Sequence, residues 1–148
     1  MAMGRESKHK FNLKVSSSSE NLEIIREFIN RIAVKGGFDT EAIEQIELAV
    51  DEACTNVIKH AHQYNSKKTL ELTVNLDINK IEIIISDKGK GFNISHIAKP
   101  DIEKSIHEAK AGGLGIHLMR TLMDEVKFNF NPGKTNKLSL TKYLRKSA

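Results

Sequence analysis

Apolar side chains recur at helical spacing in three stretches of the chain, residues 22–32, 43–62 and 114–126. This spacing predicts three amphipathic helices, each burying one stripe. Residues 43–62 form the longest of these stretches, and Asp39 or Thr40 is placed to cap the start of the helix. The predicted core stripe of this helix consists of Ile43, Ile46, Val50, Ala53, Cys54, Val57 and Ala61.

Other stretches alternate apolar and polar side chains, which is the pattern of β-strands. Residues 9–15 are expected to form an edge strand, and residues 69–76 and 81–86 a hairpin. Because residues 81–86 are almost continuously apolar, that strand is expected near the centre of a sheet. A last hairpin is predicted within residues 128–140, turning at an Asn-Pro-Gly sequence.

The order of these elements is β-α-α-β-β, a long polar loop, and then α-β-β. It predicts an α+β fold, a two-layer sandwich with helices packed on one face of a mixed β-sheet. We expect residues 1–8 to be a disordered tail and residues 9–148 to form a single domain.

Composition narrows the class of protein. The 148 residues are 39% hydrophobic and 28% charged, which is ordinary for a globular domain. No apolar run reaches the roughly 18 residues that cross a bilayer, and the start of the chain does not resemble a secretory signal. The single cysteine, Cys54, falls on the predicted core stripe. These features predict a cytoplasmic protein with no membrane association and a structural thiol.

The net charge of +4 raises the question of nucleic-acid binding. The lysines are scattered, the chain has no tryptophan, and no aromatic pattern offers a surface on which bases could stack. We therefore expect no direct nucleic-acid contact. A small positive excess suits an anionic small ligand or an acidic partner equally well.

Glu52 and Asn56 lie four residues apart on the long helix, almost opposite its apolar stripe. Their side chains therefore project from one face, one turn apart. A Glu/Asn pair taken alone is typical of a solvated helix face. The glycine-rich motifs that follow along the chain give the pair a second interpretation.

Asp87 follows the strand 81–86 and is itself followed by Gly89 and Gly91. Glycines at alternate positions allow the backbone to approach a flat ligand, because no Cβ intervenes. The carboxylate can accept a hydrogen bond from an exocyclic amine such as that of adenine. By itself this motif is equally compatible with a solvated turn.

Gly112, Gly113 and Gly115 open the third predicted helix. Backbone N–H groups at such a helix start, at the positive end of the dipole, bind phosphate oxygens. The Rossmann glycine pattern fails at both glycine clusters. A partial P-loop match ending at Thr135 is accidental, because the residues after it are predicted to form a strand.

Taken in order, the three motifs resemble the GHKL superfamily of ATP-binding proteins, which has the Bergerat fold. Glu52 and Asn56, followed by Lys-His-Ala at residues 59–61, resemble the N box of that superfamily. Residues 87–91 resemble its G1 box and residues 112–115 its G2 box. The resemblance extends over residues 22–142. The runs AVDEACTN and GGLGIHLMRTLMDEV are most similar to the small bacterial anti-sigma factor serine/threonine kinases.

The resemblance implies a role for each motif residue, with ATP and Mg²⁺ as cofactors. Asn56 would coordinate Mg²⁺ and Glu52 would be the general base that accepts the proton of an attacking hydroxyl. Asp87 would read the adenine amine, and residues 92–111 would form a lid over the nucleotide. The residues implied to contact the base, ribose and phosphates are Gly89, Gly91, Lys110, Gly112, Gly113, Leu114, Gly115, Ile116 and His117.

The resemblance also implies partners: an anti-anti-sigma factor with a STAS domain, which the kinase would phosphorylate, and a sigma factor, which it would sequester. Relatives suggest a homodimer. One alternative is a nucleotide-gated binding module of the same fold that transfers no phosphate. Another is the catalytic domain of a histidine kinase, which is disfavoured because the segment before the N box is too short for a phosphoacceptor helix pair.

The final hairpin departs from the family pattern. Many members carry Gly-Thr just before the last strand, with the threonine contacting the nucleotide. Here Thr135 and Asn136 occupy those positions. Either Asn136 replaces the threonine as a hydrogen-bonding group or the contact is missing.

Overall fold

Five strands form one sheet in the order β1-β2-β3-β5-β4 in a computed structural model, which describes residues 8–88, 114–130 and 135–145. The strands are β1 (His9–Ser16), β2 (Thr69–Leu76), β3 (Lys80–Asp87), β4 (Glu125–Phe130) and β5 (Asn136–Tyr143). Each neighbouring pair in the sheet is antiparallel. The expected α+β sandwich is confirmed, but the expectation of a mixed sheet is corrected, because β5 runs opposite to β3 after the long connection.

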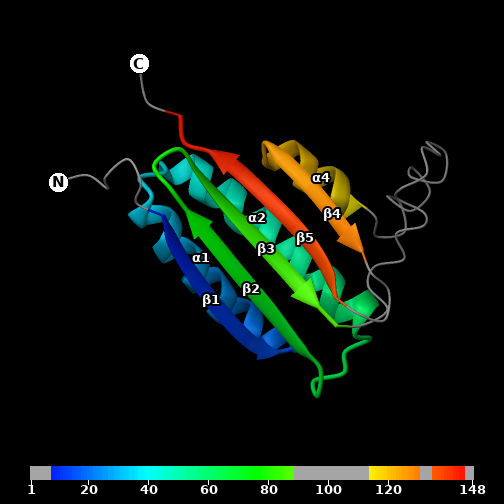
Figure 1. Ribbon diagram of the computed structural model, residues 1–148. Coiled ribbons are helices and arrows are strands. Elements are labelled where there is room, and N and C mark those ends of the chain that lie inside the picture. The colour runs from blue at the N-terminus through cyan, green and yellow to red at the C-terminus, as the bar shows by residue number, and fades with distance from the viewer. Residues whose placement is uncertain (1–7, 89–113, 131–134, 146–148) are drawn as a thin grey trace.

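The described helices all cover the same face of the sheet (Figure 1). They are the 3₁₀ turn η1 (Ser19–Asn21), α1 (Leu22–Lys35), α2 (Thr40–Asn56), the π-helical turn η2 (Val57–Ala61) and α4 (Leu114–Leu122). Helix α2 packs against both α1 and α4, so it lies centrally in the helical layer.

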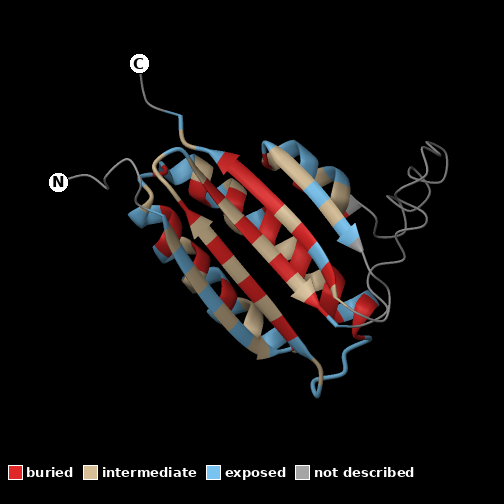
Figure 2. Ribbon diagram, in the orientation of Figure 1, coloured by how far each residue is buried: buried red, intermediate tan, exposed pale blue. Residues whose placement is uncertain are grey.

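The hydrophobic core lies between the two layers, and Figure 2 shows the alternating burial along the strands that builds it. On β3 the inward residues Ile81, Ile83 and Ile85 are buried, and β3 is the middle strand of the five, as predicted. All seven residues of the predicted stripe on the long helix are buried. Cys54 is among them with no exposed surface, and burial raises the pKa of its thiol, so it is a structural core residue.

The long helix begins where the sequence predicted but does not continue unchanged to residue 62. The Asp39 carboxylate caps it by accepting a hydrogen bond from the Ala42 N–H at 2.8 Å. After Asn56 the helix widens into η2, a π turn that holds one extra residue. From this turn onward the side chains are rotated relative to the α-helical pattern. Ile58, which the pattern left outside the core stripe, is accordingly buried.

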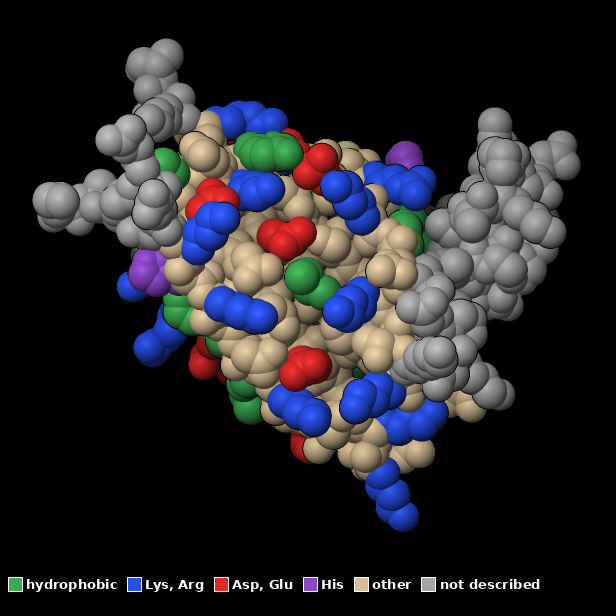
Figure 3. Space-filling view, viewed as in Figure 1, with side chains coloured by type: hydrophobic (Ala, Val, Ile, Leu, Met, Phe, Trp, Pro, Cys, Tyr) green, Lys and Arg blue, Asp and Glu red, His purple; other side chains and the backbone are tan. Residues whose placement is uncertain are grey.

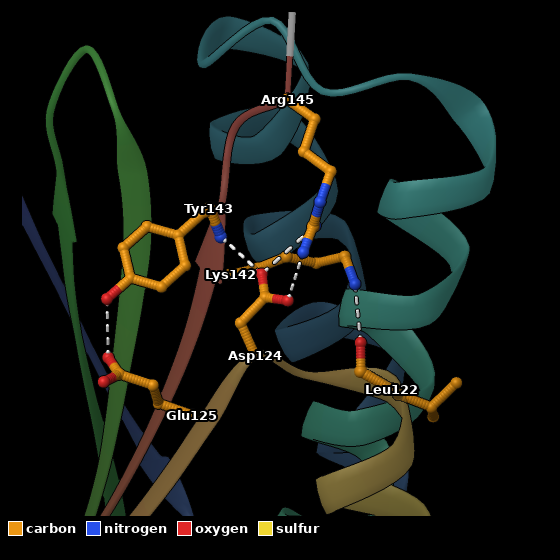
Figure 4. Close-up of polar contacts among 6 residues, drawn as sticks. All are labelled: Leu122, Asp124, Glu125, Lys142, Tyr143 and Arg145. Carbon is orange, nitrogen blue, oxygen red and sulfur yellow. Dashed lines mark hydrogen bonds and ion pairs between the residues drawn. The ribbon is translucent and has the colours of Figure 1, made fainter.

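The third helix is shorter than predicted, because the chain turns at Asp124 and residues 125–126 belong to β4. Asp124 fixes this turn through its backbone N–H, which donates to the Thr141 carbonyl at 2.9 Å. Its carboxylate accepts from the Tyr143 N–H at 2.7 Å and from Arg145 Nη2 at 2.7 Å (Figure 4). Nearby, Lys142 Nζ donates to the carbonyl of Leu122, the last residue of α4, at 2.6 Å.

The opposite face of the sheet carries no described helix and presents charges of both signs (Figure 3). Examples are Lys127 on β4 and Lys137 on β5, and Glu82 on β3 and Glu71 on β2. Among the described helices none has the length and apolar character needed to cross a membrane.

Candidate nucleotide site

Glu52 and Asn56 face helix α4. Glu52 is half-buried, and Asn56 is only 9% exposed, although the helical pattern places both opposite the core stripe. A Cβ atom added to Gly115 would lie 2.9 Å from Glu52 Oε2 and 3.0 Å from Asn56 Nδ2. The start of α4 therefore covers this face of α2, and any side chain larger than that of glycine would have to displace these two polar groups.

Neither Glu52 nor Asn56 uses its side chain to hold the fold. Within residues 8–88, 114–130 and 135–145, no hydrogen bond or ion pair engages the Glu52 carboxylate or the Asn56 amide. A carboxylate and an amide oxygen held side by side without structural partners are ligands suited to a hard cation and to proton transfer. The residues present therefore fit the Mg²⁺ and the base implied by the family resemblance.

Asp87 is the last residue of β3, and β3 ends on the side of the molecule where α2 also ends (Figure 1). Its carboxylate is buried, with 3% of the residue exposed. Across the β3–β5 pair, Asn136 Nδ2 donates to Asp87 Oδ1 at 3.3 Å. The nearest ring nitrogen, His62 Nε2, lies 4.0 Å from the same oxygen. A buried carboxylate with a single neutral hydrogen bond is costly, which favours a ligand-binding role over a structural one.

The remaining predicted site residues are placed only in part. Leu114 begins α4, and the structure describes its backbone but not its side chain. Ile116 packs its side chain against the hydrophobic core, so only its backbone N–H is available to a phosphate. His117 is exposed. Outside the described residues lie Gly89, Gly91, Lys110, Gly112, Gly113 and the predicted lid, as does the predicted tail apart from Lys8.

Two residues near the candidate site escaped sequence reasoning. His62 and Ser17 are both buried, and His62 Nδ1 lies 2.7 Å from Ser17 Oγ. They are 45 residues apart, so no local pattern links them. Asn136 donates its side-chain N–H to Asp87 within the protein, and its replacement of the family threonine as a nucleotide contact stays a prediction. The accidental nature of the P-loop match is confirmed, because a strand starts at Asn136.

Sequence comparison relates this chain to known proteins. The family model of the histidine kinase-like ATPase domain matches residues 15–142. A serine-protein kinase RsbW of Bacillus licheniformis is 37% identical over 140 residues, covering 90% of this chain and 85% of the relative. The Staphylococcus aureus serine-protein kinase RsbW is 36% identical over 148 residues, covering 95% and 91%. This chain belongs to the RsbW family of serine-protein kinases.

A solved structure extends the likeness to the fold. The crystal structure of the RsbU and RsbW domains of a Mycobacterium tuberculosis protein matches with a TM-score of 0.67 at 14% identity. The match covers 94% of this chain and 34% of that one. Membership of the RsbW family, whose domain is a histidine kinase-like ATPase domain, implies that this chain uses ATP.

Proposed function

We propose that this chain transfers the γ-phosphate of ATP to a serine or threonine of an anti-anti-sigma factor with a STAS domain, and sequesters a sigma factor when that partner is unavailable. The observation that carries the proposal is the approach of Gly115 to Glu52 Oε2 and Asn56 Nδ2. It brings a carboxylate and an amide to the helix start expected to hold phosphates. Membership of the RsbW family supports the same reaction.

Each predicted residue has a distinct task in this proposal. Asn56 holds Mg²⁺ through its amide oxygen, and Glu52, one turn earlier, accepts the proton of the attacking hydroxyl. Asp87 accepts a hydrogen bond from the adenine amine. Bound Mg²⁺ would neutralise charge on the phosphates. Base, ribose and phosphate contacts are assigned to Gly89, Gly91, Lys110, Gly112, Gly113, Leu114, Gly115, Ile116 and His117.

Partner switching follows from the charge that the reaction adds. A phosphoserine or phosphothreonine carries about 1.5 to 2 negative charges at neutral pH. Placed in an interface, that charge must be desolvated or repelled, so the phosphorylated partner dissociates. The kinase is then free to bind the sigma factor. We propose that it does so as a homodimer.

Glu52 and Asn56 can be separated experimentally. Glu52→Gln should lower the rate of phosphotransfer by about 10² to 10⁴-fold, because general-base catalysis contributes that much, while nucleotide affinity stays nearly unchanged. Asn56→Ala should abolish the increase in ADP affinity that Mg²⁺ gives. The transfer rate is measured as single-turnover transfer of labelled phosphate to a STAS-domain protein captured with ATP and Mg²⁺. Phosphosite mapping of that protein identifies the acceptor residue. Titration calorimetry measures the nucleotide affinity.

The matched control is Glu44→Gln, an exposed carboxylate two turns earlier on the same helix. This variant should transfer phosphate at the normal rate. Normal transfer by Glu52→Gln would remove Glu52 as the base. Absence of transfer from the unaltered chain, with ATP-dependent partner binding retained, would instead favour the nucleotide-gated binding module.

A further inference from the structure

Three polar side chains lie close together at the end of β3, where Asp87 is proposed to bind the adenine amine. Ser17, His62 and Asp87 come from three separate segments and are 0%, 2% and 3% exposed. Ser17 Oγ lies 2.7 Å from His62 Nδ1, and His62 Nε2 lies 4.0 Å from Asp87 Oδ1. The imidazole ring thus stands between a hydroxyl and a carboxylate. We call these three residues the buried triad.

The backbone after η2 holds His62 in this position. The His62 N–H donates to the Val57 carbonyl at 2.8 Å, closing the π turn. The next two residues, Gln63 and Tyr64, both have left-handed backbone angles, with φ of 48° and 61°. Residues other than glycine rarely adopt this conformation, so the sharp exit from the helix is held at an energetic cost. This exit allows the chain to leave the core while the His62 ring stays buried.

The two neighbours of the ring select one tautomer. If Nδ1 carried the proton, the lone pair of Nε2 would face the negative charge of Asp87. If Nε2 carries it, its N–H points toward the carboxylate and the Ser17 hydroxyl donates to Nδ1. The second arrangement satisfies both neighbours, because serine can rotate its hydroxyl to donate. We therefore assign the neutral Nε2–H form to His62.

This tautomer makes the two oxygens of Asp87 unequal. Oδ1 accepts from Asn136 Nδ2 at 3.3 Å and faces the His62 Nε2–H at 4.0 Å. At that distance the ring acts as a dipole rather than as a hydrogen-bond donor. Its effect is not screened by water, because both side chains are buried. No residue in the described part of the chain donates a hydrogen bond to Oδ2. This oxygen is therefore available to a ligand.

The charges around the ring keep it neutral near neutral pH. Burial lowers the pKa of His62, the Asp87 carboxylate opposes this effect, and Lys68 beyond the turn adds to it. Acidification below about pH 6.5 therefore begins to charge the ring. An imidazolium beside Asp87 would compete with a ligand for the carboxylate.

We propose that His62 is a positioning residue that orients Asp87, with Ser17 fixing its tautomer, so that Oδ2 is presented to the exocyclic amine of adenine. The inference rests on the proposed adenine-reading role of Asp87. It adds two residues to the determinants of base specificity, His62 from the segment after the N box and Ser17 from the segment after β1. Loss of either residue should weaken discrimination by the base more than it weakens binding as a whole.

The test compares ADP with inosine diphosphate, which lacks the exocyclic amine, by titration calorimetry in the presence of Mg²⁺. The unaltered chain should prefer ADP by about tenfold or more. His62→Phe removes the N–H at similar volume and should reduce this preference by about five- to tenfold. His62→Gln retains a donor and should restore most of it. His9→Gln, which changes a histidine at the opposite end of β1 from Ser17, is the control and should leave the preference unchanged.

Two further readouts keep the test decisive if His62→Phe does not fold. Ser17→Ala should lower the ADP preference about two- to threefold, because the tautomer is no longer fixed. The preference of the unaltered chain should also fall as the pH is lowered below 6.5, because the pKa of His62 lies below its ordinary value, while that of His62→Gln stays flat over the same range.

The outcomes separate this inference from the proposed function. If Asp87→Asn loses the ADP preference while His62→Phe and Ser17→Ala keep it, Asp87 reads adenine and the His62 role is overturned. A fall in melting temperature alone, with the preference intact, likewise makes His62 a packing residue. If the unaltered chain binds both nucleotides equally, the adenine role of Asp87 is overturned together with the inference.

Discussion

At the scale of the residue, the candidate site consists of polar side chains that form few or no hydrogen bonds with the described part of the protein. Glu52 and Asn56 are brought against Gly115, yet no described residue forms a hydrogen bond with either side chain. Asp87 is buried and engaged through one oxygen. Polar groups that are covered but not paired are the exception in folded proteins. Their presence at one end of the helical layer supports the proposed ligand site.

Gly115→Ala tests how closely α4 must approach α2. The new methyl group would meet Glu52 Oε2 and Asn56 Nδ2, the far ends of two side chains that can move aside. Alanine has the higher helix propensity, by up to about 1 kcal/mol, so the free energy of unfolding should not fall. Phosphotransfer should nevertheless fall at least about tenfold, since small displacements of catalytic groups are costly.

Denaturant unfolding and single-turnover transfer measure these two effects. Thr121→Ala, an exposed position on the same helix, is the matched control. A Gly115→Ala protein with normal transfer would show that Glu52 and Asn56 do not depend on the close approach.

At the scale of the element, the local sequence pattern predicted the helices and strands but placed the ends of two helices wrongly. Helix α4 was predicted to continue to residue 126, yet Val126 pairs with Leu140 in the sheet instead. The apolar side chain suits either element, and sheet pairing decided between them. The single helix predicted over residues 43–62 likewise contains a π turn, which no local sequence pattern predicts.

Asp124 is the residue that holds the exit from α4, and its charge makes the turn sensitive to pH. Burial alone would raise the pKa of Asp124, but the hydrogen bonds from Arg145 and from the Tyr143 N–H outweigh it and hold the pKa below 3.8. A depressed pKa stabilises the folded state above the unfolded value and loses that contribution as pH falls through the folded value. Asp124→Asn should therefore lower the free energy of unfolding by about 1 kcal/mol at neutral pH.

The difference between Asp124→Asn and the unaltered chain should shrink as pH falls from about 5 to below 3.8. Denaturant unfolding at several pH values measures it. Asp77→Asn, whose carboxylate caps the β2–β3 turn through the Asn79 and Lys80 N–H groups, is a comparison without an arginine partner. A difference that does not change with pH would show that the Asp124 charge contributes nothing.

At the scale of the whole molecule, one central helix organises both the core and the site. Helix α2 packs between α1 and α4 on the sheet, with one face in the core and the other under α4. A ligand held at that second face binds groups on both helices. It therefore stabilises the folded state as a whole rather than one segment.

Mg²⁺ with ADP should raise the thermal midpoint of the chain. At a nucleotide concentration of about 100 Kd the linkage term is about 2.7 kcal/mol, which corresponds to roughly 5 to 10 °C for a domain of this size. ADP without Mg²⁺ should give a clearly smaller rise, and Asn56→Ala should show no difference between the two conditions. Scanning calorimetry measures this, and equal rises with and without Mg²⁺ would contradict the role of Asn56.

The sequence by itself determined the order of elements, the core stripe of α2, a helix cap at Asp39 or Thr40 and the central place of β3. Each of these follows from local periodicity or capping, which a linear pattern records. It also determined the motif residues Glu52, Asn56, Asp87 and Gly115, because their types and spacing resemble a known family.

Only the tertiary structure decided which distant groups meet. It placed Gly115 against Glu52 and Asn56, and it brought His62 between Ser17 and Asp87. It also turned the sheet fully antiparallel. These facts depend on contacts between segments far apart in the chain, and side-chain periodicity within one segment carries no information about its partner.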